Sequence, residues 1–317
     1  MRAIFLDYDT VSARDLDTAS LTRALPGIEF HGSTDDQAIG QRIADADIVL
    51  VNKCALTRAR LAGAVRLKLI AIAGTGTDGV DLDAAAEFGI GVCNVRGYCT
   101  QSVMQQVWAM ILGLTQHVAE YTTLARDGSW ARDEERTVLA HPIRELAGLT
   151  LGIVGWGDLG RAAAKAAEAF GMRVLIANRP GGRAAAGRVD LDELLRASDV
   201  VSLHCPLTPA SHGLIGAREL ALMKPNALLI NTARGGLIDG HALAAALRAG
   251  RIGGAGIDVL PHEPPTGGDP LLDPSIPNLL LTPHVAWAAR EARQRCLNEM
   301  AANVQDFLDG GRRGRVV

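Results

Sequence analysis

The chain of 317 residues is long enough for about two domains, each able to bury its own core. Apolar residues make up 48% of it and charged residues 21%, which excludes a disordered or low-complexity protein. Its 32 basic and 35 acidic residues give a net charge of −3. Because nucleic acids and anionic membranes select for a basic excess, neither is expected as a partner.

The five cysteines argue against an oxidised or zinc-binding protein. Their number is odd and no C-x-x-C pair is present, so we expect neither a disulfide scaffold nor a metal site, and a reducing compartment is favoured. The N-terminal segment 1–7 reaches an acid after a short apolar run, unlike a signal peptide. No apolar run approaches the roughly 18 residues of a membrane span. These features predict a cytoplasmic globular protein.

Short β-rich runs alternate with helix-like segments through the first third of the chain. Apolar strands separated by amphipathic segments, such as 35–44 and 83–88, are typical of a parallel sheet covered on both faces. A long helix is predicted next, over about 101–125, and then a polar loop over 126–144. The predicted strands are 3–6, 28–30, 48–51, 69–73 and 90–93.

A second alternating series begins at residue 149. Its predicted helices include 159–170 and 241–249, and 183–188 is interpreted as a surface loop. The last helix, 290–308, carries apolar residues at four-residue spacing and should bury one face. The predicted strands are 149–154, 173–177, 199–204, 227–231, 254–259 and 278–281. The fold class is therefore α/β, with two doubly wound parallel-sheet units.

The start of the second series has the signature of a dinucleotide-binding turn. A strand runs into G-x-G-x-x-G and then into an alanine-rich helix, which is the context that the signature requires. Gly155 permits the tight turn, Gly157 lets the backbone approach a pyrophosphate, and Gly160 allows close helix–strand packing. The amides of Asp158 and Leu159 would face the pyrophosphate from the positive end of the helix dipole. The alternative is a glycine-rich structural turn.

Asn178 and Arg179 stand where an acid normally binds the ribose 2′-hydroxyl, about twenty residues beyond the glycines. A neutral Asn178 does not repel a 2′-phosphate, and Arg179 could pair with one through a forked, charge-assisted contact. The sequence therefore favours NADP over NAD. In the alternative, Asn178 hydrogen-bonds a plain ribose and Arg179 is solvated.

Three later motifs point to the function. They are 231–239 (NTARGGLID), 256–265 (GIDVLPHEPP) and 281–288 (LTPHVAWA). In this order, after a G-x-G-x-x-G, they resemble the D-isomer-specific 2-hydroxyacid dehydrogenases, and the resemblance covers essentially the whole chain. Trp287, together with Asn52–Lys53 and 98–103, is most similar to the glycerate dehydrogenase and hydroxypyruvate reductase branch.

The chemistry of that family explains the residue types in these motifs. Reduction of a 2-oxo acid requires a hydride on C2, a proton on the carbonyl oxygen and a group that holds the carboxylate. Arg234 is forked and charged, which suits the carboxylate and carbonyl oxygens. His284 can give the proton and take it back. Glu263 as its partner would stabilise the imidazolium. The resemblance implies that these three residues are catalytic.

Further contacts are implied by the resemblance only. The loop 74–81 matches the family's substrate loop, whose backbone amides can hold a carboxylate. Its alternative is a plain strand-to-helix turn, and ordinary core is the alternative for Cys205 and Trp287. The implied substrate contacts are Thr75, Gly76, Thr77, Arg234, His284 and Trp287. The implied cofactor contacts beyond the glycine-rich turn are Thr75, Cys205, Pro206, Thr232, Ala233 and Asp258. No metal has a role in the family pattern.

The family fold implies a flavodoxin-like substrate domain, 1–98 plus 286–317, and a Rossmann nucleotide-binding domain, 99–285, with the active site in the cleft between them. Members pair as homodimers through the nucleotide domain, with 101–125 near the interface. The resemblance also implies a small-molecule 2-oxo or 2-hydroxy acid of D configuration as substrate, with hydroxypyruvate or glyoxylate as the best candidates.

Two other functions stay open at this point. One is an NAD(H)-sensing binding protein similar to the corepressors of this fold, which carry additional tails where this chain ends at residue 317. The other is a formate dehydrogenase-like enzyme, but such enzymes have Gln where this chain has Glu263. The preference for a substrate side chain is also open, since Lys53 could meet a polar or anionic tail or face solvent.

Overall fold

The computed structural model describes residues 1–132 and 138–317. The chain forms two compact units: unit 1 is Met1–Cys99 with Trp287–Val317, and unit 2 is Thr100–Ala286. The domain boundaries expected from the sequence, 98/99 and 285/286, each lie one residue before the boundary between the two units. Each unit contains a parallel sheet between helices, so the predicted fold class is confirmed.

The sheet of unit 1 has five parallel strands in the order β2-β1-β3-β4-β5. This is the flavodoxin-like order, in which the direction of winding reverses between β1 and β3. Every residue of β1, β3, β4 and β5 is buried, as expected for strands covered on both faces. The bounds are β1 (Ala3–Phe5), β2 (Glu29–Phe30), β3 (Ile48–Val51), β4 (Leu69–Ile72) and β5 (Gly91–Cys93).

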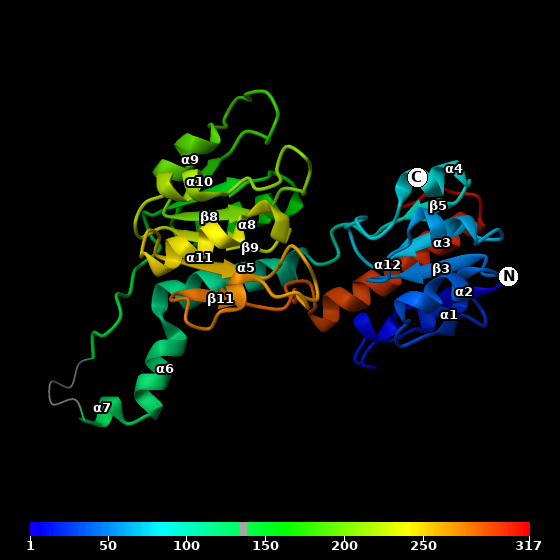
Figure 1. Cartoon of the computed structure of the whole chain (residues 1–317), viewed down its shortest axis with the longest axis horizontal. Coiled ribbons are helices and arrows are strands. Elements are labelled where there is room, and N and C mark those ends of the chain that lie inside the picture. Colours follow the sequence, from blue (N-terminus) through cyan, green and yellow to red (C-terminus); the bar gives the residue numbers. More distant parts are fainter. Residues whose placement is uncertain (133–137) are drawn as a thin grey trace. The chain divides into compact units, whose positions relative to one another are not determined.

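Helices cover both faces of this sheet (Figure 1). One face carries α1 (Ala19–Ala24) and the C-terminal helix α12 (Arg290–Leu308), which returns the end of the chain to unit 1. The other face carries α2 (Ile39–Ile43), α3 (Arg58–Ala62) and α4 (Leu82–Glu87). Two short 3-10 helices complete the unit, η1 (Tyr8–Thr10) and η2 (Asp36–Ala38).

The sheet of unit 2 has six parallel strands in the order β11-β10-β9-β8-β6-β7. Its first strand, β6, lies between β7 and β8, so the winding reverses between β6 and β8. In open α/β sheets, ligands bind at the carboxyl ends of the strands beside such a reversal. The bounds are β6 (Thr150–Val154), β7 (Arg173–Ile176), β8 (Val200–Leu203), β9 (Leu228–Asn231), β10 (Gly254–Ile257) and β11 (Leu279–Leu281).

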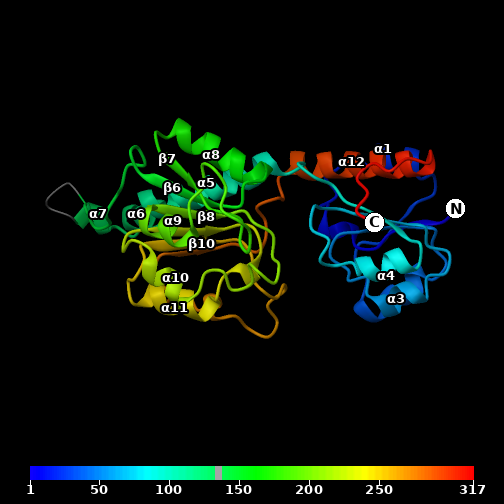
Figure 2. The same cartoon turned by 90° about the horizontal axis from the view of Figure 1, so that it is seen from above.

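The helices of unit 2 also form two layers, which are seen edge-on in Figure 2. On one side α5 (Thr100–Gln116) packs against α8 (Asp158–Ala169) and the sheet. On the other side α9 (Leu191–Ala197), α10 (Ala217–Leu222) and α11 (Gly240–Arg248) enclose a large apolar core with β8, β9 and β10. The 3-10 helices are η3 (Gly235–Leu237) and η4 (Pro270–Leu272). No helix in the described ranges is both long and apolar enough to cross a bilayer.

The single helix predicted over 101–125 is wrong, because it breaks at His117. This residue is left-handed, with a φ of 49°, and it separates α5 from α6 (Val118–Arg126). One left-handed residue redirects the helix axis, and α6 projects from the body of unit 2 together with α7 (Ser129–Arg132) (Figure 1). The helix α7 falls inside the predicted loop 126–144, whose residues 133–137 lie outside the described ranges.

Candidate active site

The glycine-rich turn after β6 is tightly packed at Gly155 and Gly160 and open at Gly157. Gly155 has a φ of 105°, and a Cβ there would come within 2.5 Å of the Cys205 nitrogen. A Cβ at Gly160 would overlap the carbonyl oxygen of Gly155, whereas a Cβ at Gly157 would meet nothing within 4 Å. The exposed main chain at Gly157 and the first N–H groups of α8 fit the pyrophosphate of a dinucleotide. These N–H groups belong to the two predicted residues, Asp158 and Leu159.

The segment after β7 is organised by Asn178. Its side-chain Nδ2 donates to Asp190 Oδ1 at 2.9 Å, and its Oδ1 accepts from the Ala185 N–H at 3.0 Å. Its main-chain N–H donates to Val189, which closes the loop 179–188. Arg179 is exposed at the start of this loop. Asn178 therefore shapes the loop with both atoms of its amide, and direct contacts of Asn178 and Arg179 with a cofactor stay predictions.

The segment that follows β8, His204 to Pro206, lies beside the glycine-rich turn. His204 bonds Ser202 Oγ through Nε2 at 2.9 Å, and burial lowers the pKa of its imidazole to about 4. The Cys205 side chain lies in the apolar core, where burial raises the pKa of its thiol to about 11. Pro206 is exposed. A cofactor contact by Cys205 and Pro206 stays a prediction, and for Cys205 it would involve the main chain.

The turn after β9 contains a buried hydroxyl whose hydrogen-bonding capacity is unused. Thr232 Oγ1 has no partner among the described residues. An unsatisfied buried polar atom is uncommon in a folded protein, and a bound group that completes it is one of the usual reasons. The neighbouring Ala233 N–H is already bonded to Asn231 Oδ1. The Thr232 hydroxyl therefore fits a cofactor-binding position better than the Ala233 N–H does.

The three predicted catalytic residues follow neighbouring strands of unit 2. Arg234 comes after β9, Glu263 after β10 and His284 after β11, and these strands lie side by side and parallel. Their carboxyl ends therefore meet at one edge of the sheet. Gly235 brings the first two loops into direct contact, since a Cβ there would overlap the main chain of Leu260.

Glu263 and His284 are paired directly. Glu263 Oε2 lies 2.5 Å from His284 Nδ1, and the two side chains are 28% and 27% exposed. The other carboxylate oxygen, Oε1, accepts the Leu260 N–H at 3.0 Å. The carboxylate is thus oriented by the main chain on one side and faces the imidazole on the other. This is the arrangement in which a carboxylate orients a histidine for proton transfer.

The first residue of the NTARG turn, Asn231, has a role that the sequence did not reveal. It is fully buried, and its Oδ1 accepts the Ala233 N–H at 3.0 Å while its Nδ2 donates to the Arg234 oxygen at 2.9 Å. Arg234 Nη1 also donates to the Ala233 oxygen at 2.8 Å. The only available signal was an amide that ends an otherwise apolar strand.

Asp258 has a similar structural role in the loop of His284. It is 1% exposed, and its carboxylate accepts the Thr282 hydroxyl at 2.5 Å and the amides of Val285 at 3.0 Å and Ala286 at 2.9 Å. His284 itself is left-handed, with a φ of 53°, and its N–H donates to the Asp258 main-chain oxygen. The contact of Asp258 with the nicotinamide side of a cofactor stays a prediction beside this role.

In unit 1, the predicted substrate loop follows β4. Two hydrogen bonds hold its Thr75. The Thr75 hydroxyl donates to the Val95 oxygen at 2.7 Å, and Asn94 Nδ2 donates to the Thr75 main-chain oxygen at 2.7 Å. Among the described residues, nothing accepts the N–H groups of Thr75, Gly76 and Thr77. Such a run of amides fits a carboxylate.

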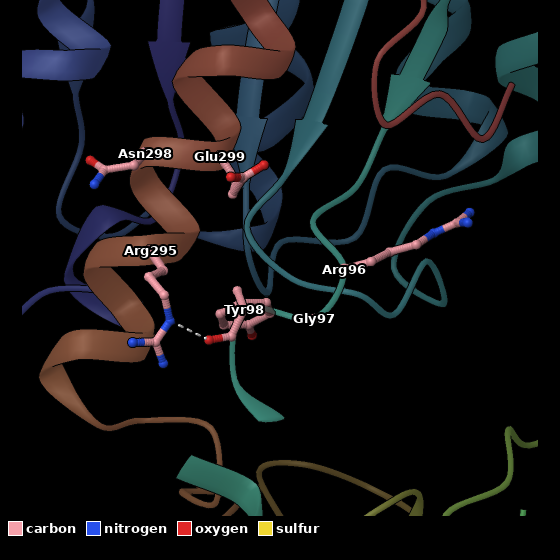
Figure 3. Close-up of a pocket in the computed structure, with 6 residues that line it drawn as sticks. All are labelled: Arg96, Gly97, Tyr98, Arg295, Asn298 and Glu299. Atoms are coloured by element: carbon pink, nitrogen blue, oxygen red, sulfur yellow. Dashed lines mark hydrogen bonds between the residues drawn. The ribbon is translucent and has the colours of Figure 1, made fainter. Parts of the chain in front are cut away.

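Two other features of unit 1 bear on the predicted site. Trp287 is partly buried against the unit's apolar core, so its role as a pocket wall stays a prediction. A pocket of about 380 Å³ lies next to α12, and Arg295 Nε donates there to the Tyr98 oxygen at 2.9 Å (Figure 3). No predicted site residue lines this pocket, and Figure 3 shows Arg96 and Arg295 pointing in different directions. Across residues 1–132 and 138–317, no three His, Cys, Asp or Glu side chains are grouped to hold a metal.

Comparison with known proteins agrees with this geometry. The model of the D-isomer specific 2-hydroxyacid dehydrogenase NAD binding domain matches residues 108–286. The chain is 44% identical to the glycerate dehydrogenase of Methylorubrum extorquens, over 89% of each chain, and 35% identical to the hydroxypyruvate reductase of Blautia hydrogenotrophica, over 98% of each. The crystal structure of the TT0316 protein from Thermus thermophilus covers the whole chain with a TM-score of 0.86 and 37% identity.

The chain belongs to the D-isomer specific 2-hydroxyacid dehydrogenase family, and the resemblance seen in its motifs is confirmed. The relatives also agree with the glycerate dehydrogenase and hydroxypyruvate reductase branch. Unit 2 is the nicotinamide-cofactor domain of this family. The reaction class is hydride transfer between that cofactor and C2 of a small D-2-hydroxy acid or its 2-oxo form.

Proposed function

We propose that this protein reduces hydroxypyruvate, and glyoxylate as a smaller second substrate, with a preference for NADPH. The observation that carries the proposal is the pair formed by His284 and Glu263, 2.5 Å apart at the sheet edge where Arg234 also lies. The names of the relatives, glycerate dehydrogenase and hydroxypyruvate reductase, support the choice of substrate.

Each catalytic residue has a defined task in this proposal. Arg234 binds the substrate carboxylate and polarises the C2 carbonyl with its forked guanidinium. Because Glu263 faces Nδ1, the ring nitrogen that exchanges a proton with the C2 oxygen is Nε2 of His284. Glu263 keeps the ring oriented and offsets the positive charge it carries before the transfer. A bound nicotinamide supplies the hydride to C2.

The polar tail of hydroxypyruvate has candidate partners at the carboxyl end of β3. Asp7, which follows β1, is 2% exposed and accepts the N–H groups of Asn52 at 2.9 Å and Lys53 at 2.6 Å. These bonds hold the segment at the winding reversal of unit 1, the place where doubly wound sheets bind ligands. We propose that Asn52 and Lys53 recognise the tail hydroxyl, and that the amides of Thr75 to Thr77 bind the carboxylate.

The preference for NADPH rests on the charge and shape of the loop after β7. Arg179, Arg183 and Arg188 lie within ten residues of one another there. Asn178 gives the loop its shape through Asp190 and Ala185 and adds no negative charge of its own. A 2′-phosphate would gain from this concentration of guanidinium groups.

We also propose a cytoplasmic homodimer. Large apolar side chains are exposed on and beside the projecting α6 and α7, notably Val118 (57%), Trp130 (60%) and Leu139 (82%). Apolar surface of this kind marks an interaction site, and a second copy of the chain is the occupant that the family resemblance implies. The cytoplasmic location is supported by the five free cysteines.

A panel of 2-oxo acids assayed with NADPH and with NADH tests the proposal. Loss of nicotinamide absorbance should be fastest with hydroxypyruvate and NADPH. Turnover of an apolar 2-oxo acid in preference to hydroxypyruvate would refute the substrate, and a higher kcat/KM with NADH would refute the cofactor preference. Cofactor binding without turnover of any 2-oxo acid would instead favour the sensing function. Light scattering at the assay concentration tests the dimer.

A further inference from the structure

A hydrogen-bonded chain connects α5 to the loop of His284. Gln106, on α5, donates from Nε2 to Thr282 Oγ1 at 3.2 Å. Thr282 donates to Asp258 Oδ1 at 2.5 Å, and Asp258 accepts the amides of Val285 and Ala286. Gln106 and Thr282 are both half-buried, so solvent competes only in part for these bonds. All of these residues belong to unit 2.

The direction of each bond in this chain is determined by chemistry. The groups that bond the Asp258 carboxylate, one hydroxyl and two main-chain amides, are all donors, as a carboxylate requires. The single hydroxyl hydrogen of Thr282 is used on Asp258, so Thr282 can only accept at its other contact. The amide nitrogen of Gln106 is the donor that satisfies this requirement. The short O–H···O distance is typical of a charge-assisted bond.

This series of hydrogen bonds stabilises an unusual main-chain conformation of His284. A φ of 53° is the left-handed region, which residues other than glycine seldom occupy. Asp258 holds this conformation from both sides, with its main-chain oxygen on the His284 N–H at 2.7 Å and its carboxylate on the next two amides. The direction of the imidazole therefore depends on the position of the Asp258 carboxylate.

We propose that Thr282 and Gln106 are positioning residues for His284, acting through Asp258. The inference rests on the proposed function, in which His284 moves the proton. Neither residue forms a hydrogen bond with the imidazole, so their contribution is to its placement and not to its chemistry. Misplacement of a reacting group by about 1 Å can cost on the order of 100-fold in rate.

Substitutions at Thr282 test the first link. Thr282→Val keeps the shape and removes the hydroxyl, so kcat should fall by about 10- to 100-fold with little change in the KM for cofactor. Thr282→Ser keeps the hydroxyl and should restore most of the turnover. The matched control is Thr115→Val, which removes a hydroxyl of α5 that bonds only the main chain of its own helix, at Ile111 and Leu112. This control should keep the wild-type kcat.

Substitutions at Gln106 test the second link. Gln106→Leu removes the donor to Thr282 and should lower kcat less than Thr282→Val does. Gln106→Glu should be worse than Gln106→Leu, because two carboxylates would then compete for one hydroxyl hydrogen. The matched control is Gln116→Leu on the same helix, where the lost bond goes to the Arg144 oxygen. A loss in this control as large as in Gln106→Leu would refute a specific role for Gln106.

Hydrogen exchange provides a readout that is independent of activity. In Thr282→Val, the peptide that contains the Val285 and Ala286 amides should exchange faster than in wild type, and in Thr115→Val it should not. Unchanged exchange together with unchanged kcat in Thr282→Val would overturn the proposal, as would a Thr282→Ser variant no better than Thr282→Val. If wild type turns over no 2-oxo acid but exchange responds as expected, the loop support stands and the proposed function fails.

Discussion

The half-buried His204 should make the stability of unit 2 depend on pH. Its Nδ1 has no partner among the described residues, and burial lowers the pKa of the imidazole from its ordinary value of 6.5 to about 4. The folded protein therefore keeps this ring neutral at pH values where the unfolded chain has already bound a proton. The stability that this difference provides is fully present above about pH 6.5 and is lost progressively as the pH falls toward about 4.

The size of the effect follows from the two pKa values. Their difference corresponds to about 3 kcal/mol of unfolding free energy at or below about pH 4, and to about 2 kcal/mol at about pH 5. A domain of this size has a stability of roughly 5–15 kcal/mol, so the loss is a measurable fraction of the total. Other groups also titrate over this interval, so a variant that cannot ionise at position 204 is needed to isolate the contribution.

The variant His204→Gln provides that comparison. Urea unfolding at about pH 7.5 and about pH 5 can be followed by tryptophan fluorescence, which reports mainly on unit 2 because three of the four tryptophans lie there. Between the two pH values, wild type should lose about 2 kcal/mol more than His204→Gln. If the two proteins lose stability in parallel, the folded state accepts the proton without cost and the argument from burial is wrong.

The proposed catalytic and cofactor-binding residues provide further tests. His284→Ala should lower kcat by about 10²- to 10⁴-fold while NADPH affinity, measured by fluorescence titration, stays the same; near-wild-type turnover would remove His284 from the mechanism. Arg234→Lys keeps the charge but loses the fork, so kcat/KM for the 2-oxo acid should fall by about 10-fold or more, and an unchanged value would refute bidentate binding. Asn178→Asp should lower the ratio of kcat/KM for NADPH to kcat/KM for NADH, and an unchanged ratio contradicts the phosphate interpretation. The same change should lower the Tm, because the new carboxylate would face Asp190 and could not donate to it. Gly160→Ala should destabilise the fold by about 1–3 kcal/mol, since its Cβ overlaps the Gly155 oxygen. Gly157→Ala should keep the wild-type Tm and weaken NADPH binding, and equal Tm losses in the two variants would refute this distinction.

The strands and the final helix could be predicted from the sequence because their signals are local. Runs such as Ile48–Val51 are apolar throughout, as strands covered on both faces must be, and 290–308 repeats apolar residues at helical spacing. The break at His117 could not be predicted in this way. No glycine or proline marks it, and nothing in the local sequence indicates that a histidine adopts a left-handed conformation there.

The sequence by itself determined which chemical groups are proposed to take part in the reaction. Arg234, Glu263 and His284 stand in motifs whose residue types match a reaction that needs a fork, a carboxylate and a proton donor. Only the tertiary structure decided how these groups are held. The bond from Glu263 to His284 joins residues 21 positions apart, and the one from Gln106 to Thr282 joins residues 176 positions apart. Contacts across such separations depend on which strands lie side by side and on where a glycine lets two loops touch, and neither is recorded in the local pattern of residues.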